Sequence, residues 1–585
     1  MKSQVLVVPG SIVRLSADII AYSTSEGMHS GGQMHPAFIS NIKSFKEEHA
    51  RIKRETEKCG RKVGDTLWID LKGKKPRGVI ITISRPNDNN KVNLSDIYKA
   101  VLNTLQFARE KLAGEDNSTQ KLIALPCYLA GHGGSWKELK EIATLQMRAT
   151  FDFIAENEEG KIDVAFVTYT DATYHAWTAA RKSLLLEKGL GKHVGIDLPQ
   201  DLVESIRRNE CAVFFGSGIS VNSGLPGWKE LITELADELD IAPEQRGTGP
   251  DYFLDLAQWY RDSGKEPTVE KRLQARYQRE NTGALPTIAH YLLASLPVGY
   301  FLTTNYDDLM ECALEGLKRY PVRVISDTDT IKTGGRDDCY LIKPHGCATQ
   351  DTGFVLSRDD YEDFEANKPA TTILMESLLL TKSFFFVGYS LRDPDFRSIN
   401  HRLAKILDKE KKTAYALTYD AVTPHVRKQW SSKNIELVEV EGETDADKDQ
   451  SLMYILDSLL ENVSENEIKY LGEIKYNTSD PRCKSYWQHL ESIAVETVKE
   501  LGSVVLAERG EIIAFAATVS HLASLGWRGR EHVKLPAILQ ELAESPRLFN
   551  DDRKKILMEA MRYCESEGEF ERIKEKIIRL EKDSG

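Results

Sequence analysis

A strand that runs into closely spaced glycines is the feature of this sequence that most directly suggests chemistry. The apolar run Cys211–Phe215 leads into Gly216, Ser217 and Gly218. Glycines at such a turn let the backbone bend sharply and approach a pyrophosphate, and a helix N-terminus after them would favour its negative charge. Many α/β proteins contain a turn of this kind without binding a nucleotide, so the turn alone does not decide the function.

Three further blocks follow at the ends of apolar, strand-like runs. They are FLTTNYDDLMECAL from Phe301, LIKPHGCATQ from Leu341 and FFFVGYSLRDPDF from Phe384. Each block places polar residues or glycine where an apolar run stops. Together, and in this order, the four blocks are much more specific than the first turn.

With these blocks, the segment from Leu198 to Ser398 resembles the sirtuin-like family, in particular its bacterial, zinc-free branch found in anti-phage defence proteins. The resemblance rests on the GSGIS and SGLP halves of the first loop, the TTNYD block, the PHG block with a downstream VLSRDDY, and the final GYSLRDPDF. It implies a doubly wound, Rossmann-type α/β domain that binds NAD.

The resemblance also implies a role for each matching residue. Asn305 would order the nicotinamide ribose or the attacking water, and His345 matches the family's catalytic histidine. Asp307 belongs to the same motif as Asn305 and completes the catalytic set, although a purely structural role is an open alternative. The residues expected to bind the phosphates, the ribose or the adenosine half are Gly216, Ser217, Gly218, Ser220, Thr304, Gly388, Tyr389 and Ser390.

These side chains suit cleavage of the N-glycosidic bond of NAD. The reaction passes through an oxocarbenium-like ribose, so the site needs polar groups on the ribose hydroxyls and an enforced geometry for the nucleophile. A histidine can accept a proton from a ribose hydroxyl or from water near neutral pH. Asparagine can orient that nucleophile without adding charge. Leu225 and Trp228 are expected to pack in the core behind the glycine loop rather than to contact the ligand.

The cysteines favour hydrolysis of NAD over deacylation of lysine. Lysine-deacylating sirtuins carry a small module with four zinc-binding cysteines, whereas the eight cysteines of this chain are scattered and form no CxxC pair. We therefore expect NAD as substrate, no zinc, and nicotinamide and ADP-ribose as products, with depletion of cellular NAD in anti-phage defence. Two alternatives stay open: a non-catalytic sensor of NAD or ADP-ribose, and an NAD-dependent protein deacylase.

The first 190 residues alternate strand-like and helical patterns, which predicts a separate α/β domain. Its segments SADIIAYSTSEGMHSGGQMHPAF and LIALPCYLAGHGGSW resemble the two ligand loops of macro domains, which bind ADP-ribose. In that comparison Asp18 would accept a hydrogen bond from the adenine amino group. The residues that the resemblance implies for ligand binding are Asp18, Gly31, Gly32, Gly131 and Gly133. Glu26 departs from the pattern, and a scaffold that only mediates assembly is the alternative.

The chain is thus expected to contain three domains. A macro-like α/β domain would span 1–190, and a sirtuin-like catalytic domain would span 191–446, with a helical insert from about Ala242 to Ala294. Periodic apolar residues after that predict an all-helical domain at 447–585 for oligomerisation or partner binding.

The overall composition limits the partners. A formal net charge of -12 argues against direct binding to nucleic acid, because such binding requires clustered basic residues. No apolar run is long enough to cross a bilayer, and no secretory signal is visible, so we expect a cytoplasmic protein. Uncontrolled NAD hydrolysis would kill the host cell, which suggests regulation through a homo-oligomer or a partner. A HerA-type ATPase is one such partner by family analogy.

Overall fold

The structure is a computed structural model that describes most of the chain in two compact units. The units are Met1–Gly131 with Ile142–Ser464, and His132–Glu141 with Glu465–Gly585. The residues described are 3–28, 34–42, 44–71, 75–85, 94–113, 120–129, 136–157, 161–169, 171–187, 198–247, 249–317, 322–325, 339–350, 353–389, 412–464, 539–540, 542–544, 548, 550–561 and 567–582.

The first unit begins with a six-stranded sheet whose strand order is β1-β6-β5-β2-β4-β3. The β3–β4 pair is antiparallel and the other neighbours are parallel. The strands are β1 (Val5–Pro9), β2 (Ile19–Ser25), β3 (Thr66–Asp70), β4 (Gly78–Arg85), β5 (Lys121–Pro126) and β6 (Ile162–Thr168). The elements around them are η1 (Ile12–Arg14), α1 (Met34–Asn41), α2 (Phe45–Cys59), α3 (Leu94–Leu112), α4 (Trp136–Ala155) and α5 (Asp171–Glu187). The α/β class predicted for this region is confirmed.

A second sheet in the same unit has seven parallel strands in the order β13-β12-β11-β7-β8-β10-β9. The strands are β7 (Cys211–Phe215), β8 (Tyr300–Thr303), β9 (Val322–Ile325), β10 (Cys339–Ile342), β11 (Ser383–Val387), β12 (Ala414–Thr418) and β13 (Ile435–Glu439). Every residue of β7 and β11 is buried, as expected of parallel strands with both faces covered. The predicted doubly wound sheet is confirmed.

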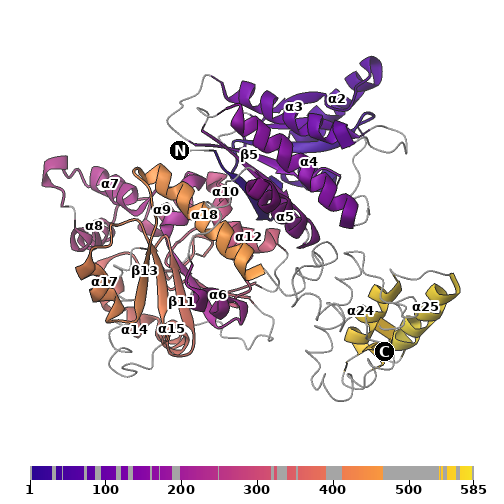
Figure 1. Cartoon of the computed structure of the whole chain (residues 1–585). Coiled ribbons are helices and arrows are strands. Elements are labelled where there is room, and N and C mark those ends of the chain that lie inside the picture. The colour runs from indigo at the N-terminus through magenta and orange to yellow at the C-terminus, as the bar shows by residue number, and fades with distance from the viewer. Residues whose placement is uncertain are drawn as a thin grey trace. The chain divides into compact units, whose positions relative to one another are not determined.

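The direction of chain progression reverses between β7 and β11. From β7 the chain continues to β8 on one side, whereas β11, β12 and β13 follow one another on the other side. Such a reversal leaves a crevice beyond the carboxyl ends of the two central strands, where ligands bind in open α/β sheets. Helices α6 (Gln200–Arg207), α15 (Pro369–Thr381) and α17 (Pro424–Ser431) lie around these strands in Figure 1.

The predicted helical insert lies between β7 and β8 and is longer than expected at its start. Two short turns come first, η3 (Ser217–Ile219) and η4 (Val221–Ser223). The helices are α7 (Trp228–Glu238), α8 (Pro250–Asp262), α9 (Val269–Tyr277), α10 (Arg279–Thr282) and α11 (Ile288–Ala294), with η5 (Pro243–Gln245) between the first two. Apolar residues of α7, α8 and α9 share one core with Tyr306 and Leu309, which follow β8. The insert is therefore packed onto the carboxyl edge of the sheet.

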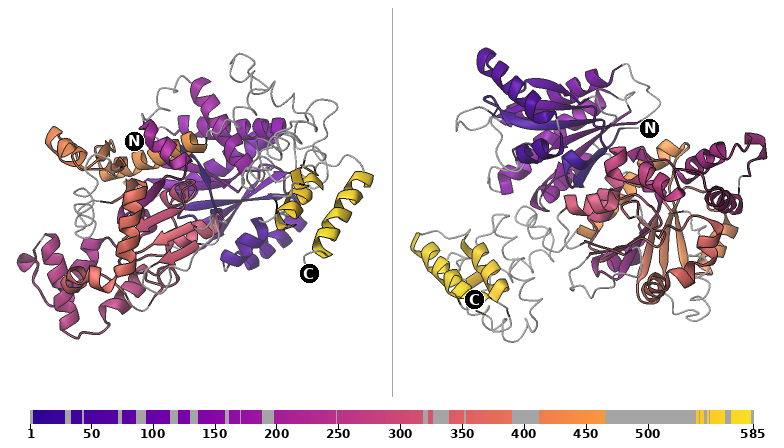
Figure 2. Two further views of the ribbon diagram at one scale, coloured as in Figure 1. Left: turned by 90° about the horizontal axis from the view of Figure 1, so that it is seen from below. Right: turned by 180° about the vertical axis from the view of Figure 1, so that it is seen from behind.

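Helix α18 (Asp445–Ser464) completes the first unit, where it contacts α6, α11 and β1. Arg181 of α5 forms ion pairs with Asp457 and Glu461 of α18, and the distance from its Nη2 to Glu461 Oε2 is 3.0 Å. In the second unit, α24 (Asn550–Met561) and α25 (Glu567–Lys582) lie side by side in both views of Figure 2. The domain boundaries at 190 and 446 stay a prediction. In the part of the chain described, no helix is both long and apolar enough to span a membrane.

Candidate functional site

A cavity of 350 Å³ lies at the carboxyl edge of the seven-stranded sheet, at the point where the strand order reverses. It is lined by residues that directly follow β7, β8, β10 and β11. The predicted site residues in its wall are Gly216, Ser217, Ser220, Thr304, Asn305, Asp307, His345, Gly388 and Tyr389. Gly218 is not part of the wall, and Ser390 lies outside the described residues. The structure thus brings together residues that are far apart in the sequence.

A second cavity of 800 Å³ is larger but is built differently. It lies between the helical insert and residues 353–368, and Arg261 in its wall pairs with Glu270 at 3.2 Å and with Asp360 at 2.8 Å. Because these charges already satisfy one another, we assign the candidate site to the smaller cavity.

The glycines of the first loop allow two strand ends to meet. A Cβ atom on Gly216 would lie 2.4 Å from the carbonyl oxygen of Gly388, and one on Gly218 would lie 2.9 Å from its Cα. Gly388 itself has a φ of +59°. Glycine is therefore required at these positions because the loops after β7 and β11 pack backbone to backbone. Whether the loop also has room for a pyrophosphate does not follow from this contact.

The expectation of a helix N-terminus directly after these glycines is wrong. The loop continues through the 3-10 turns η3 and η4, and α7 begins only at Trp228. Gly227 and Trp228 at the start of α7 line the cavity, so a helix N-terminus does reach the site. It comes after η3 and η4 rather than directly after Gly218.

Asn305 and Asp307 lie just beyond β8 and are both buried. Asn305 Nδ2 donates to Ser220 Oγ at 3.3 Å, and its backbone N–H donates to Thr303 Oγ1 at 3.0 Å. Asp307 accepts hydrogen bonds from Ser220 Oγ at 3.1 Å and from the backbone N–H of Leu309 at 3.2 Å. Ser220 of the glycine loop therefore joins both residues of the TTNYD block.

Burial raises the pKa of Asp307 to about 6, and Lys343, which opposes this shift, approaches from the end of β10. Lys343 Nζ donates to the carbonyl oxygen of Asp307 and to Glu311 Oε1, the latter at 2.9 Å. Lys343 is itself fully buried, so these contacts stabilise its positive charge in place of water. Apart from its place two residues before His345, nothing in the local pattern of residues singles out Lys343.

His345 follows β10, and aromatic rings surround its imidazole. Tyr361 contacts it edge to face with ring centres 5.2 Å apart, and Phe364 lies 6.3 Å away. The carbonyl oxygen of His345 accepts from the backbone N–H of Val355 at 3.1 Å. Gly346 has a φ of +93°, and any Cβ there would lie 2.9 Å from the Gly353 oxygen. The backbone next to His345 is therefore tightly constrained.

Apolar and aromatic side chains also line the cavity, and the sequence did not reveal this part of the lining. Leu225 and Trp228 pack against the core of the insert, as predicted, and both also line the cavity. Val221, which is 56% exposed, lines it as well. The other apolar or aromatic members of the wall are Pro226, Phe253, Leu254, Tyr277, Tyr306 and Tyr361. No local pattern separates such residues from ordinary core positions.

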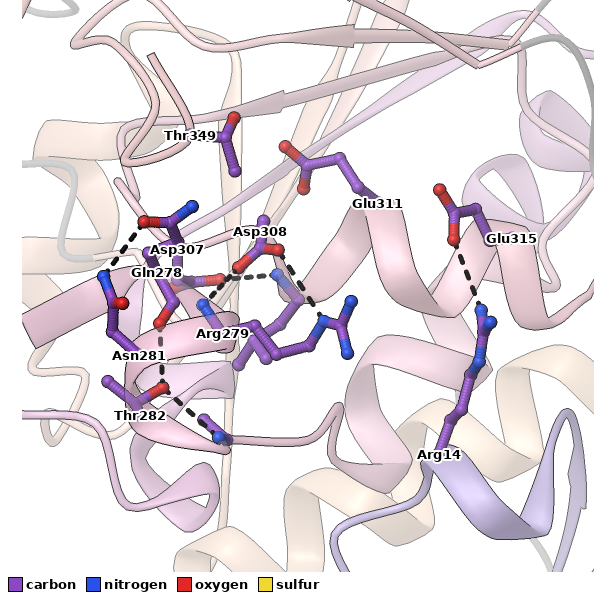
Figure 3. A network of polar contacts seen from close by, with 12 residues as sticks. Arg14, Gln278, Arg279, Asn281, Thr282, Asp307, Asp308, Glu311, Glu315 and Thr349 are labelled. Carbon is purple, nitrogen blue, oxygen red and sulfur yellow. Dashed lines mark hydrogen bonds and ion pairs between the residues drawn. The ribbon is translucent and has the colours of Figure 1, made fainter. Parts of the chain in front are cut away.

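Polar contacts hold α12 (Leu309–Gly316), the helix after Asp307, on two sides (Figure 3). On one side, the backbone N–H of Arg279 donates to Asp308 Oδ1 at 2.9 Å. On the other side, Arg14 of η1 pairs with Glu315 at 3.3 Å. Asp308 is the N-cap residue of α12 and directly follows Asp307, so the contact with Arg279 fixes the start of the helix next to Asp307.

Among the predicted ligand residues of the six-stranded sheet, Asp18 is the one that the structure describes. Asp18 lies at the amino end of β2 and accepts from the backbone N–H of Leu122 at 2.8 Å. Lys75 Nζ and Arg77 Nε lie 3.7 and 3.8 Å from its carboxylate. Asp18 therefore ties β2 to its neighbours at the edge opposite the carboxyl ends, and its contact with adenine stays a prediction. Gly31, Gly32, Gly131 and Gly133 lie outside the described residues.

The described cysteines form no disulfide with one another and are dispersed through the fold. They are Cys59, Cys127, Cys211, Cys312, Cys339 and Cys347. Within the described ranges, no three His, Cys, Asp or Glu side chains are grouped so that they could hold a metal ion. The absence of zinc stays a prediction.

Comparison with known proteins identifies the domain that carries the cavity. Residues 299–438 match the SIR2-like domain family. The NAD(+) hydrolase ThsA of Cytobacillus dafuensis is 29% identical over 218 residues, which cover 37% of this chain and 43% of that protein. Defense-associated sirtuin 2 of Bacillus subtilis is 27% identical over 219 residues, which cover 36% of this chain and 21% of that protein. The chain spans less than half of the length of each of these relatives.

Solved macrodomain structures are similar to part of this chain. The macrodomain of Oceanobacillus iheyensis with MES bound is matched over 92% of its length and 31% of this chain, with 17% identity and a TM-score of 0.26.

The family match from 299 to 438 contains Asn305, Asp307, His345 and Gly388. The resemblance that the four sequence blocks suggested is thereby confirmed.

Proposed function

We propose, because the chain contains a SIR2-like domain, that its cavity binds NAD and that the protein hydrolyses it. Water would add to C1′ of the nicotinamide ribose while the bond from C1′ to the nicotinamide nitrogen breaks. The electron pair of that bond stays with nicotinamide, and water loses one proton. The products are nicotinamide, ADP-ribose and H⁺. We further propose that this reaction depletes cellular NAD in anti-phage defence, as the names of the relatives suggest.

The observation that carries the proposal is the convergence of polar groups in one cavity. Ser220, Asn305, Asp307 and His345 come from three separate strand ends and line the same 350 Å³ space. Its position at the reversal of strand order is where dinucleotides bind in sheets of this type. Its volume lies within the range of pockets that enclose small molecules.

The lining of the cavity suits the two parts of the reacting half of NAD. Its apolar members, Leu225 and Trp228 among them, offer a surface for the flat nicotinamide ring and exclude water from it. Its polar members Asn305 and His345 suit the ribose hydroxyls and the nucleophile. Hydrolysis then depends on how one water is held at C1′, because enforced geometry lowers the barrier.

Release of nicotinamide from NAD by the purified full-length protein tests the proposal. We expect nicotinamide and ADP-ribose in equal amounts without any added peptide. Release that appears only with an acylated lysine peptide would support the deacylase alternative instead. Binding of NAD without its consumption, by the chain alone and with proteins from neighbouring genes, would support a sensor.

The remaining expectations concern where the protein acts, how it assembles and what controls it. We propose that it acts in the cytoplasm as a homo-oligomer, under control of a partner such as a HerA-type ATPase or of a ligand of the macro-like domain. The reaction uses NAD as substrate and needs no zinc. Mass measurement of the purified protein with and without its candidate partner checks the assembly.

A further inference from the structure

His290 is a buried histidine that no part of the proposed mechanism uses. It is the third residue of α11, and none of its surface is exposed. Its Nδ1 accepts a hydrogen bond from the backbone N–H of Thr287 at 3.1 Å, and its Nε2 lies 3.4 Å from Ser220 Oγ. His290 therefore reaches the loop that holds Asn305 and Asp307, although it lies 70 residues from Ser220 along the chain.

The direction of each hydrogen bond follows from the backbone. Two groups of Thr287 face Nδ1 of His290: the backbone N–H at 3.1 Å and the hydroxyl Oγ1 at 2.9 Å, which also donates to the carbonyl oxygen of Ile219 at 2.9 Å. The hydroxyl can donate or accept, whereas the backbone N–H can only donate, so the N–H makes Nδ1 the unprotonated nitrogen. Burial lowers the pKa of His290 to about 3, which keeps the ring neutral. In a neutral ring with a free Nδ1, the proton is on Nε2. His290 Nε2 therefore donates to Ser220 Oγ.

This donation decides what Ser220 offers to its other neighbours. A serine hydroxyl has one proton and two acceptor positions. The proton goes to Asp307 Oδ2 at 3.1 Å, since an ionised carboxylate can only accept. One acceptor position is taken by His290, and the other faces the side-chain amide of Asn305 at 3.3 Å. The group that Asn305 turns toward Ser220 must therefore be its NH₂.

The orientation of the amide has a chemical consequence. With Nδ2 held by Ser220, the carbonyl oxygen of Asn305 is directed away from Ser220, and Asn305 lines the cavity. A carbonyl oxygen in that place can accept a hydrogen bond from water, whereas an NH₂ group would repel the hydrogens of that water. The orientation of the Asn305 amide thus decides whether the site can bind water through its hydrogens and leave a lone pair of the water oxygen free to attack.

We propose that His290 is a positioning residue that acts through Ser220 to fix Asn305 with its carbonyl oxygen toward the attacking water. The inference rests on the proposed NAD hydrolysis for the identity of that water. The competing role is purely structural, because Thr287 and His290 also form the capping box of α11. The experiment must therefore measure something that a helix cap does not affect.

Two substitutions separate the roles in the full-length protein. His290→Gln keeps one acceptor and one N–H donor, whereas His290→Leu keeps neither. His49→Leu removes another buried histidine, in helix α2 beside the six-stranded sheet, and serves as the matched control. The readouts are kcat and KM for NAD, and the ratio of methyl ADP-ribose to ADP-ribose formed when methanol competes with water.

We expect kcat of His290→Leu to fall by a factor on the order of 10², with KM changed by less than about threefold, because misplacement of a reacting group costs about that much in rate. The methanol-to-water product ratio should rise, since the site no longer selects water. His290→Gln should stay close to the unsubstituted protein in both readouts, as should His49→Leu. Unchanged kcat and product ratio in His290→Leu would overturn the proposal.

A second measurement needs neither activity nor a drastic substitution. The ¹⁵N shifts of the protein labelled only at histidine report which ring nitrogen carries the proton, and His290→Gln identifies the signal of His290 by its loss. We expect a neutral ring protonated at Nε2. A ring protonated at Nδ1, or a charged ring, would overturn the inference even if NAD is hydrolysed. If no NAD is hydrolysed, the proposed function fails, whereas the ¹⁵N shifts still decide whether His290 has the Nε2 proton that it needs to donate to Ser220.

Discussion

The two sheets of the first unit use their polar side chains in opposite ways. Beyond the carboxyl ends of the seven-stranded sheet, Asn305 and His345 line a cavity. In the six-stranded sheet, Asp18 lies at the amino end of β2, where Leu122, Lys75 and Arg77 already engage its carboxylate. A polar residue next to a buried strand therefore indicates a site only at the carboxyl edge and only where a cavity receives it.

The same contrast appears between two buried carboxylates. Burial raises the pKa of Asp307 and of Asp457 to about 6. Asp307 lines the cavity and accepts from Ser220, whereas Asp457 is locked to Arg181 between α5 and α18. A perturbed pKa thus accompanies both a candidate site and a structural ion pair, and only the surroundings separate the two.

The largest expected effect is the loss of NAD hydrolysis when the cavity loses its polar groups. Asn305→Ala and His345→Ala should each lower kcat/KM by about 10²–10⁴, the usual contribution of a positioned acid, base or orienting group. Nicotinamide release measures the effect. Asn281→Ala and His425→Ala remove the same residue types from exposed positions and should leave the rate unchanged. So should Asp18→Asn; a comparable loss in Asp18→Asn would remove the contrast between the two sheets.

The next effect concerns stability rather than catalysis. Arg181→Leu leaves Asp457 and Glu461 buried without their cation, which should lower the free energy of unfolding by about 3–5 kcal/mol. Arg148→Leu is the control, because Arg148 pairs with Glu187 at the surface and such pairs contribute little. Denaturant titration of both variants gives the comparison. Equal stability of the two would contradict a structural role for the buried pair.

A smaller effect is expected where the two loops of the cavity meet. Gly216→Ala introduces a Cβ 2.4 Å from the Gly388 oxygen, so the loops must separate at a cost of about 1–3 kcal/mol. We expect a higher KM for NAD together with a lower melting temperature. Gly249→Ala, with open space around its Cβ, is the control in the same insert. An unchanged KM in Gly216→Ala would show that loop contact and ligand binding are independent.

The smallest effect is a dependence on pH. The pKa of Asp307 is raised to about 6, so its carboxylate is ionised above that pH and protonated below it. The groups that face it are Lys343 beyond β10, Glu311 on α12, Tyr277 on α9 and Ser220 on the glycine loop. Protonation removes the acceptor for the Ser220 proton. Hydrolysis should therefore fall as pH falls through about 6, by up to about tenfold per unit.

The pH profile of kcat measures this limb between pH 5 and pH 8. Asp307→Asn cannot ionise, so its profile should lack the limb whatever its absolute rate. A profile of the unsubstituted protein that is flat across pH 6 would show that the state of Asp307 does not limit turnover, and would place Asp307 with Asp457 as a structural carboxylate.

Much of the seven-stranded sheet could be predicted because its signals are local. Apolar runs such as those of β7 and β11 indicate parallel strands buried on both faces. Parallel strands end at a common edge, so the polar blocks after β7, β8, β10 and β11 had to meet there. That logic predicted that Asn305 and His345 share one site. It does not apply to Asp18, which a resemblance of loops singled out and which precedes β2 rather than following it.

The strands, the glycine turn and the sheet edge that carries the cavity follow from the amino-acid sequence, since each depends on residue type and short-range spacing. The folded chain was needed to show that Trp228 lines the cavity, that Gly216 contacts Gly388, and that His290 reaches Ser220. Those relations depend on which faces of separate segments are packed together. Packing of this kind is set by the whole core and leaves no pattern in the sequence around any one of these residues.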